Sequence, residues 1–325
     1  MQNKIALEEH FAIPETIEGA LIYDRDAASV LDIPTRLLDM MEHRIRDMDD
    51  NGIDLTILSL NSPAIQEICK PEEAAEVAKL ANDRLAETIE RNKSRFRGFA
   101  ALPMQNTDMA IEEMKRAVCD LGMVGVLVNG YSQIGSPDND VYLDHPMYRA
   151  FWEELEKLDV PFYLHPREPM PRNAGLLENK YWLHGAAWAF GVETSTHALR
   201  LLSSGIFDEF PRLKLLIGHL GEGLPFLVWR CDNMLKKRKR GMPAKRLMAE
   251  YMNDNVWVTT SGQFHTPPLL CTMLQMGADR ILFSTDYPFE EVSDAATWFD
   301  ACPISGGDKY KIGRQNAVEL FNLQL

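Results

Sequence analysis

The segment Lys4–His10 (KIALEEH) has an apolar centre, Ile5–Leu7, and ends on three ionisable side chains. A short apolar run of this kind predicts a buried strand. In a barrel of parallel strands the carboxyl ends of all strands meet on one face, and active sites are built on that face. We therefore expect Glu8 and His10, which close this first strand, to lie in a site.

Seven further apolar runs follow along the chain, separated by longer stretches with helical periodicity. The eight predicted strands are Lys4–His10, Ile53–Leu60, Phe96–Leu102, Met123–Asn129, Val160–His165, Leu213–His219, Asn255–Ser261 and Arg280–Asp286. The predicted helices are Arg36–Asp50, Pro71–Arg91, Thr107–Leu121, Met147–Leu158, Ala186–Ser203, Gly223–Lys236, Pro267–Met276, Val292–Ala301 and Asp308–Phe321. This alternation predicts an α/β fold, a closed (β/α)8 barrel of the TIM type, with a doubly wound open sheet as the alternative. Since no Ser/Gly-rich linker interrupts the series, we expect one catalytic domain over residues 1–325.

Unusual polar residues close four of these strands. Glu8 and His10 close the first, His165 the fifth, His219 the sixth and Asp286 the eighth. A barrel brings such residues together although they lie far apart in the sequence. Imidazole nitrogens and carboxylate oxygens are ligands of first-row divalent metals, so the group predicts a zinc or manganese site. Magnesium fits less well, because it prefers oxygen ligands and water.

Strand alternation adds a finer expectation for the first strand. Glu8 and His10 are two residues apart, so regular alternation sends both side chains into the barrel mouth. The same alternation predicts Ala6 on that side, with Ile5 and Leu7 facing the helices.

Composition excludes several classes of partner. The chain has 34 Lys and Arg against 48 Asp and Glu, a formal net charge of -14, which repels phosphate backbones and anionic lipid. The basic run Lys236–Arg240 follows an apolar-periodic stretch and is typical of a helix C-terminus. No long uncharged apolar run predicts a membrane span, and no secretory signal is visible. Five scattered cysteines favour reduced thiols and a cytoplasmic location.

Several residues remain open between a structural and a functional role. Glu222 is either a helix-capping acid or a hydrogen-bond partner that sets the tautomer of His219. Arg230 is either a surface cation or an anchor for an anionic substrate. His197 lies inside a helical pattern and is expected to be a core residue. For both His184 and His265, the pocket wall and a solvated loop are equally expected locations.

Four motifs together resemble the decarboxylase branch of the amidohydrolase superfamily. They are Lys4–Ala12 (KIALEEHFA), Pro161–Arg167 (PFYLHPR), Gly218–Glu222 (GHLGE) and Ile281–Glu290 (ILFSTDYPFE). The resemblance is strongest to the γ-resorcylate (2,6-dihydroxybenzoate) decarboxylases, with the 2,3-dihydroxybenzoate and salicylate decarboxylases nearby. It extends to Lys311–Ala317, nearly the whole chain.

The resemblance implies an activity: reversible, metal-dependent, non-oxidative decarboxylation of an ortho-hydroxybenzoate, a small aromatic acid. It implies one divalent ion per chain (Zn²⁺ or Mn²⁺) and a homodimer or homotetramer. The implied metal ligands are Glu8, His10, His165 and Asp286. The implied catalytic residues are Asp286, His219 and Glu222. The implied substrate-binding residues are Arg230, at a subunit contact, with Phe190, Phe289, Asn129 and Tyr23.

Two departures from the family pattern bear on the substrate. The sister 2,3-dihydroxybenzoate and salicylate enzymes tend to carry alanine at the position of His10, so the E-x-H form here favours the γ-resorcylate type. Against this, the loop over residues 16–35 does not follow the usual sequence, and His265 replaces a common arginine. The ring substitution pattern therefore stays open.

Two rival functions remain. The first is hydrolysis of a lactone or amide on the same barrel. Binuclear hydrolases of this superfamily tend to show H-x-H on the first strand and a bridging lysine on the fourth, where this chain has E-x-H and Asn129. The second is a catalytically inactive barrel that serves as a scaffold.

Overall fold

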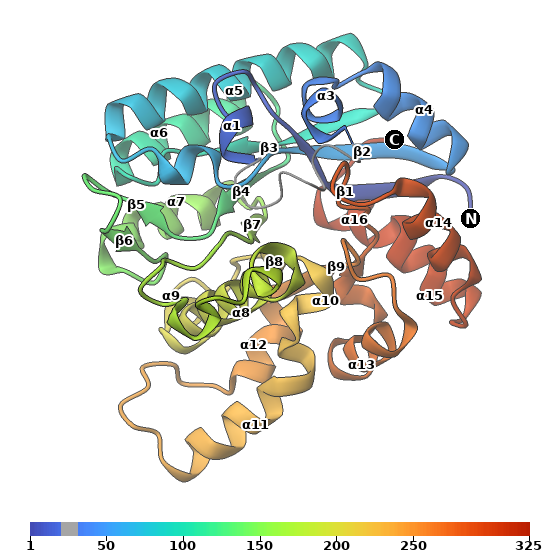
Figure 1. The fold of residues 1–325 in the computed structure, drawn as a ribbon. Helices are drawn as coiled ribbons and strands as arrows, with labels where there is room; N and C mark the ends of the chain where they lie inside the picture. Colours follow the sequence, from blue (N-terminus) through green and yellow to red (C-terminus); the bar gives the residue numbers. More distant parts are fainter. Residues whose placement is uncertain (21–31) are drawn as a thin grey trace.

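Eight parallel strands form the centre of the computed structural model, which describes residues 1–20 and 32–325 (Figure 1). Their order in the sheet follows their order in the sequence. The strands are β1 (Lys4–Phe11), β2 (Ile53–Leu60), β3 (Phe96–Ala101), β4 (Gly125–Asn129), β7 (Phe162–His165), β8 (Leu215–Ile217), β9 (Val256–Thr259) and β10 (Ile281–Leu282). A parallel bridge from Leu7 to Ser284 joins the first strand to the end of the series. This closure confirms the (β/α)8 barrel and rules out the open sheet.

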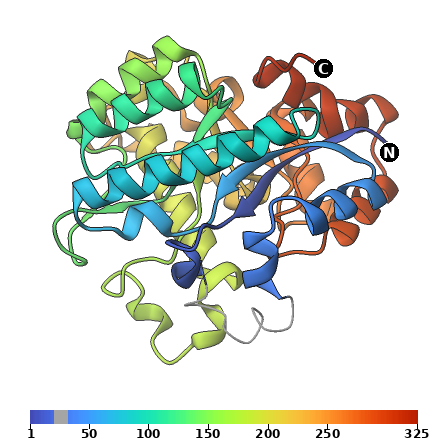
Figure 2. The same ribbon diagram turned by 90° about the horizontal axis from the view of Figure 1, so that it is seen from above.

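Helices surround the barrel on the outside, as the view from above shows (Figure 2). They are α1 (Ile17–Ala20), α3 (Ile33–Leu38), α4 (Glu42–Asp50), α5 (Pro71–Arg91), α6 (Thr107–Lys115), α7 (Arg149–Leu158), α8 (Ala189–Ser203), α9 (Ile206–Glu209), α10 (His219–Glu222), α11 (Leu224–Lys237), α12 (Met248–Asn255), α13 (Thr266–Met276), α14 (Val292–Ala301), α15 (Gly306–Tyr310) and α16 (Asn316–Leu320). A small antiparallel pair, β5 (Ser132–Gln133) and β6 (Asp140–Val141), lies beside the barrel. Lys236 and Lys237 lie in the last turn of α11, as the basic run predicted.

Some predicted helices are interrupted, and side chains explain one break. The predicted helix Arg36–Asp50 is two helices, because the Asp39 carboxylate accepts hydrogen bonds from the backbone N–H groups of Met41, Glu42 and His43 at 2.7 to 2.8 Å. These bonds cap α4 and end α3. The predicted helix Asp308–Phe321 likewise contains a π-helical turn, Lys311–Gln315. Helices α9 and α12 were not predicted.

The barrel interior is a cluster to which all eight strands contribute. It includes Ile5, Leu7, Phe99 and Tyr163. Phe321, which follows α16, packs into the same cluster, with its ring 5.6 Å from that of Phe99. The C-terminal segment thus closes one end of the barrel with apolar side chains.

Within the described residues, no helix has the length and apolar character to cross a membrane. All five cysteines are free thiols.

Candidate metal centre

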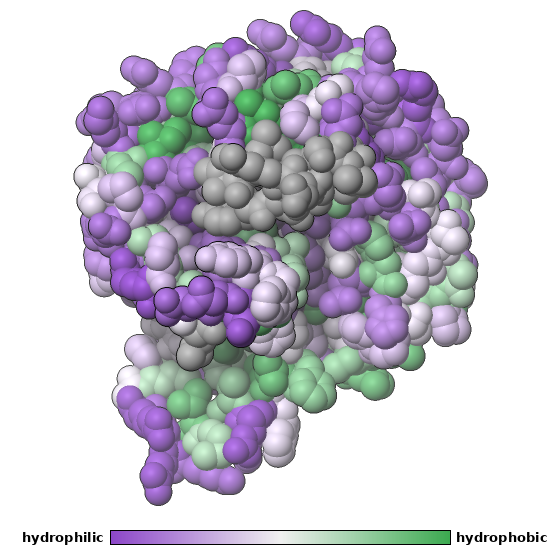
Figure 3. Space-filling model, in the orientation of Figure 1, coloured by the Kyte–Doolittle hydropathy of each residue, from purple (hydrophilic) through white to green (hydrophobic). Residues whose placement is uncertain are grey.

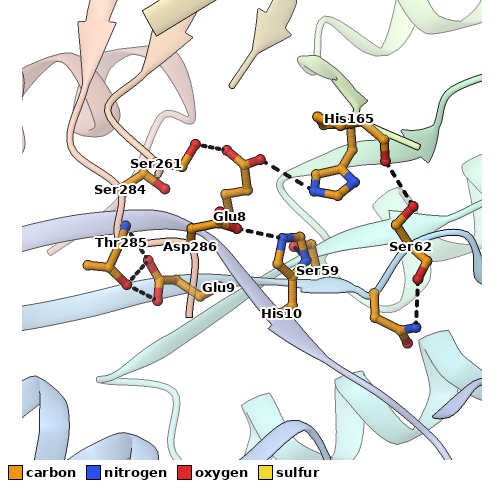
Figure 4. Close-up of polar contacts among 12 residues, drawn as sticks. Glu8, Glu9, His10, Ser59, Ser62, His165, Ser261, Ser284, Thr285 and Asp286 are labelled. Atoms are coloured by element: carbon orange, nitrogen blue, oxygen red, sulfur yellow. Dashed lines mark hydrogen bonds and ion pairs between the residues drawn. The ribbon is translucent and has the colours of Figure 1, made fainter. Parts of the chain in front are cut away.

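Four side chains from distant parts of the sequence meet at one end of the barrel (Figure 4). Glu8 and His10 come from β1, His165 is the last residue of β7, and Asp286 lies four residues beyond β10. One donor atom from each lies within 4.8 Å of the others. The structure therefore brings together the four residues predicted as metal ligands.

A β-bulge in β1, not regular alternation, turns Glu8 and His10 the same way. Ala6 pairs with Thr56 and Glu9 with Leu58, so β1 has one extra residue here, and Glu8 adopts a left-handed φ of 55°. The predicted alternation was wrong for the residues before the bulge. Leu7 and Ile5 point into the barrel, and Ala6 packs in the outer cluster with the helices.

Hydroxyl groups inside the barrel hold the Glu8 carboxylate. Its Oε2 accepts hydrogen bonds from Tyr163 and Ser261, and from Thr259 Oγ1 at 3.0 Å. Sequence reasoning missed these three residues. The available signal was their position: Tyr163 lies two residues before His165, and Thr259 and Ser261 are two apart at the end of β9.

The remaining donor atoms fit a divalent ion. Glu8 Oε1 and His10 Nε2 are buried and have no hydrogen-bond partner among the described residues. His10 Nδ1 contacts Ser59 Oγ at 3.1 Å, which fixes the ring and leaves Nε2 directed toward the cluster. The pairs His10 Nε2–Asp286 Oδ1 and His165 Nε2–Glu8 Oε1 are both 3.4 Å apart. Ligands at ~2.1 Å from one ion in tetrahedral geometry lie about 3.4 Å from each other.

The pKa shifts of His165 and Glu8 also fit a bound metal ion. Burial lowers the pKa of His165 well below its usual range, so the ring is neutral, as a metal ligand must be. Burial also raises the pKa of the Glu8 carboxyl, although the charges of His219 and His10 oppose the shift. A buried carboxylate is stable when it is paired or bound to a metal.

His219 links the cluster to a second carboxylate. Its Nε2 lies 3.5 Å from Asp286 Oδ2, and its Nδ1 contacts Glu222 Oε1 at 2.7 Å. Burial alone would lower the pKa of His219, but Glu222, Glu8 and Asp286 raise it well above its usual range. Burial likewise disfavours ionisation of Asp286, yet the neighbouring imidazoles of His10 and His219, 3.4 and 3.5 Å from its carboxylate oxygens, hold its pKa below the usual range. Glu222, His219 and Asp286 thus form a continuous series of polar contacts.

Backbone strain is concentrated at these positions. Glu8, His219, Glu222 and Asp286 all have a φ between 50° and 67°, a left-handed conformation that costs non-glycine residues about 1–3 kcal/mol each. Gly218 is required beside them, because a Cβ there would lie 2.9 Å from both Glu8 carboxylate oxygens. Residues held in this way aim several side chains at one point.

The other predicted site residues lie at different distances from the cluster. The Phe289 ring centroid is 5.7 Å from that of His10. Asn129 ends β4 in register with His165, and its Nδ2 donates to the Asn61 carbonyl at 2.9 Å. Phe190 lies in the first turn of α8, where a Cβ at the neighbouring Gly191 would be 3.1 Å from Glu222 Oε2.

Two predicted substrate-binding residues remain, one on the surface and one outside the described residues. Arg230 lies on the exposed side of α11. Tyr23 lies outside the described residues, as does most of the divergent loop over residues 16–35.

The remaining histidines have separate surroundings. His197 is buried and its Nε2 accepts a hydrogen bond from the Leu143 N–H at 2.9 Å, which confirms the predicted core role. His184 contacts the carboxylate of Glu168, which also accepts a hydrogen bond from the Gly185 N–H at 2.8 Å. His265 is exposed and precedes α13.

A cavity of about 710 Å³ lies elsewhere, beside the outer part of α8. Tyr142, Glu193 and Arg200 are among the residues that line it, and none of the four metal-ligand candidates does. The cavity is therefore separate from the metal-ligand cluster.

Three comparisons with known proteins agree closely. The sequence profile of the amidohydrolase family matches residues 14–323. A γ-resorcylate decarboxylase of Rhizobium sp. (strain MTP-10005) is 50% identical over 331 residues, which cover 99% of each chain. A crystal structure of 2,6-dihydroxybenzoate decarboxylase in complex with 2,6-dihydroxybenzoate has a TM-score of 0.97 at 50% identity, covering 99% of this chain and 100% of that one.

A further solved structure bears on the metal. The dihydroxybenzoic acid decarboxylase of Polaromonas sp. JS666, with bound manganese and the inhibitor 2-nitroresorcinol, has a TM-score of 0.96 at 50% identity. The match covers 99% of this chain and 98% of that one.

Proposed function

This chain belongs to the amidohydrolase family, and we propose that it decarboxylates 2,6-dihydroxybenzoate to the phenol and carbon dioxide. The reaction would be reversible and would need no oxidant. One observation carries the proposal: the full-length similarity to γ-resorcylate decarboxylases coincides with a four-residue metal-ligand cluster that contacts the half-buried His219–Glu222 pair. Residues 1–325 would act as one catalytic domain, since both ends of the sequence close the same barrel. The free thiols favour the cytoplasm as its location.

We propose one Zn²⁺ or Mn²⁺ per chain, held by Glu8, His10, His165 and Asp286. Two imidazoles and two carboxylates suit either ion, and the Polaromonas relative contains manganese. When bound, the ion supplies a template and a positive charge for the substrate carboxylate and its ortho oxygen.

The chain's own residues would supply the proton. In the reaction a proton replaces the carboxyl group on the ring carbon, and the electrons of the broken carbon–carbon bond restore aromaticity. An ortho phenolate makes this possible because it directs electron density to that carbon. His219, held protonated by Glu222, would pass its proton through Asp286 Oδ2 to the ring carbon.

The pocket walls would orient the ring. Phe289, beside His10, and Phe190, at the start of α8, offer apolar surface for a planar ring. We assign Asn129 to the pocket floor next to His165. Tyr23 and Arg230 are proposed as further substrate contacts from the resemblance to the family.

The rival hydrolase function would use the same metal ion to activate water against a lactone or amide. Asn129 stands where binuclear hydrolases tend to carry a bridging lysine, and its amide is engaged with the Asn61 carbonyl. The cluster of four donors found among the described residues suits one ion and lacks that lysine, which argues against a binuclear hydrolase.

The test of the function is a panel of benzoates. We expect turnover of 2,6-dihydroxybenzoate first, then 2,3-dihydroxybenzoate and salicylate, and none of benzoate, 3-hydroxybenzoate or 2-methoxybenzoate, since these cannot form an ortho phenolate. Release of carbon dioxide and phenol measures the reaction. In heavy water the product should carry one deuterium at the carbon that lost the carboxylate, and high bicarbonate should drive the reverse reaction. Cleavage of lactones or amides, with every ortho-hydroxybenzoate left untouched, would falsify the proposal.

We also propose a homodimer or homotetramer that uses the apolar face formed by α11 and α13. Phe226 is 78%, Trp229 68% and Leu274 90% exposed, and apolar surface gathers over these two helices (Figure 3). A continuous apolar patch of this kind marks a protein contact on a soluble chain. Arg230 lies in the same face, where a subunit contact would bring it to a substrate pocket.

Replacing Leu274 and Phe226 by glutamate is expected to convert the oligomer to a monomer in analytical ultracentrifugation, because two buried charges would oppose association. The exposed Tyr310 on α15 supplies the matched control, Tyr310→Glu, which should leave the assembly unchanged. A monomeric wild-type chain, or a double variant that stays associated, would exclude this face.

A further inference from the structure

The barrel does not close between β1 and β10 by a regular ladder. Strand β10 ends at Leu282, and its extension pairs with β1 only through the bridge from Leu7 to Ser284. Two further backbone bonds hold the segments, from Leu7 N to the Phe283 carbonyl at 3.3 Å and from His10 N to the Tyr287 carbonyl at 2.7 Å. The metal-ligand candidates of both segments lie between these bonds.

The side chain of Glu9 fills the gap in this ladder. Its Oε1 accepts the backbone N–H of Thr285 at 2.9 Å, and the Thr285 hydroxyl lies 2.7 and 2.9 Å from the two carboxyl oxygens (Figure 4). Glu9 is only 2% exposed, so water does not compete for these bonds. A carboxyl group thus takes the place of a strand carbonyl, directly before Asp286.

Arg44 braces the same region from helix α4. Its guanidinium donates to the His10 carbonyl and lies 4.2 Å from the centre of the Tyr287 ring. It is 2% exposed. Arg44 therefore holds the His10 carbonyl and the Tyr287 ring from outside the barrel. Glu9 holds Thr285, the residue before Asp286.

We infer that Glu9 is a positioning residue, which sets the distance between the β1 ligands and Asp286 through its bonds to Thr285. The reason is mechanical. Glu8 and Asp286 have strained left-handed backbones, and strained residues keep their geometry only where surrounding contacts enforce it. A shift of about 1 Å in a reacting group can lower the rate about 100-fold. The kinetic part of this inference rests on the proposed function.

The first test needs no substrate. Metal-stripped Glu9→Ala is expected to bind Mn²⁺ roughly 10–100-fold more weakly than wild type in calorimetric titration, the usual effect of losing a group that orients ligands. The electron paramagnetic resonance spectrum of bound Mn²⁺ should broaden. Glu9→Gln keeps an oxygen that accepts the Thr285 N–H, so its affinity should be largely restored.

The kinetic test separates kcat from KM. Glu9→Ala should lower kcat by roughly 10–100-fold at saturating metal, with a smaller change in KM, and Thr285→Ser, which keeps the hydroxyl, should behave as wild type. The matched control is Glu113→Gln on α6, a buried carboxylate bonded to Asn82 and Arg116. It should lower the melting temperature without changing kcat or metal affinity.

Wild-type metal affinity and kcat in Glu9→Ala would overturn the inference. It would also fail if all buried-carboxylate variants, Glu113→Gln included, lost kcat in proportion to lost stability. If Glu9→Ala does not fold, Thr285→Val, which removes the hydroxyl bonded to both Glu9 carboxyl oxygens, reports the same contact, and its wild-type metal affinity and kcat would count against the inference. Failure of the proposed function alone would leave the metal-binding result intact.

Discussion

Asp286→Asn is expected to lower kcat for 2,6-dihydroxybenzoate by at least about 100-fold, with little change in KM. The amide occupies nearly the same volume and keeps an oxygen for the metal position. It cannot carry the proton that passes from His219 Nε2, which lies 3.5 Å from Asp286 Oδ2 in the wild-type structure. Binding of substrate should therefore survive while proton delivery is lost.

Steady-state kinetics and metal analysis on the same preparation make this measurement. The matched control is Asp294→Asn, an exposed aspartate in the first turn of α14, which should have wild-type kinetics. Near-normal kcat in Asp286→Asn would exclude Asp286 as the acid. A large rise in KM with unchanged kcat would assign it to substrate binding instead.

Complete removal of metal is expected to abolish decarboxylation, and about one equivalent of Zn²⁺ or Mn²⁺ per chain should restore it. Glu8 Oε1 and His10 Nε2 belong to the candidate ligand cluster and have no hydrogen-bond partner among the described residues, so a bound cation would satisfy both atoms. His165→Ala should lower metal content as well as activity, because its Nε2 lies 3.4 Å from Glu8 Oε1.

Elemental analysis before and after chelation checks this result. His43→Ala is a suitable control, since that imidazole is exposed on α4, away from the cluster. Full turnover by a metal-free preparation would exclude the metal-dependent mechanism. Restoration by only one of the two ions would identify the working metal.

Local patterns were sufficient for most of the secondary structure. The prediction for Pro71–Arg91 agrees with α5 at both ends, since proline begins the helix, Glu72 and Glu73 follow in the first turn, and Arg91 closes the last. One predicted helix was wrong because a side chain inside it bonded the backbone. Asp39 divided one predicted helix because its carboxylate could bond three backbone N–H groups at once.

The candidate site was predicted more completely than the contacts that orient it. Strand-end positions identified Glu8, His10, His165 and Asp286, which the structure brings together. The resemblance of the motifs to the decarboxylase branch is confirmed by the family profile and by relatives of 50% identity. The partners of Glu8 were missed. Tyr163, Thr259 and Ser261 belong to other strands, and no local signal distinguishes an inward hydroxyl that binds a ligand from one that fills the barrel.

The sequence by itself determined which residues could form strands, which strand ends carry metal-binding side chains, and therefore the barrel and the chemistry of its site. Only the tertiary structure decided the direction of those side chains. The bulge at Glu8 reverses the alternation before it, and His219 and Asp286 adopt left-handed φ values of 50° and 67° that the strand pattern did not predict. The physical reason is that periodicity reports the average burial of a segment. The free-energy cost of a single strained φ is offset by contacts such as that between Glu9 and Thr285, which are 276 positions apart in the sequence.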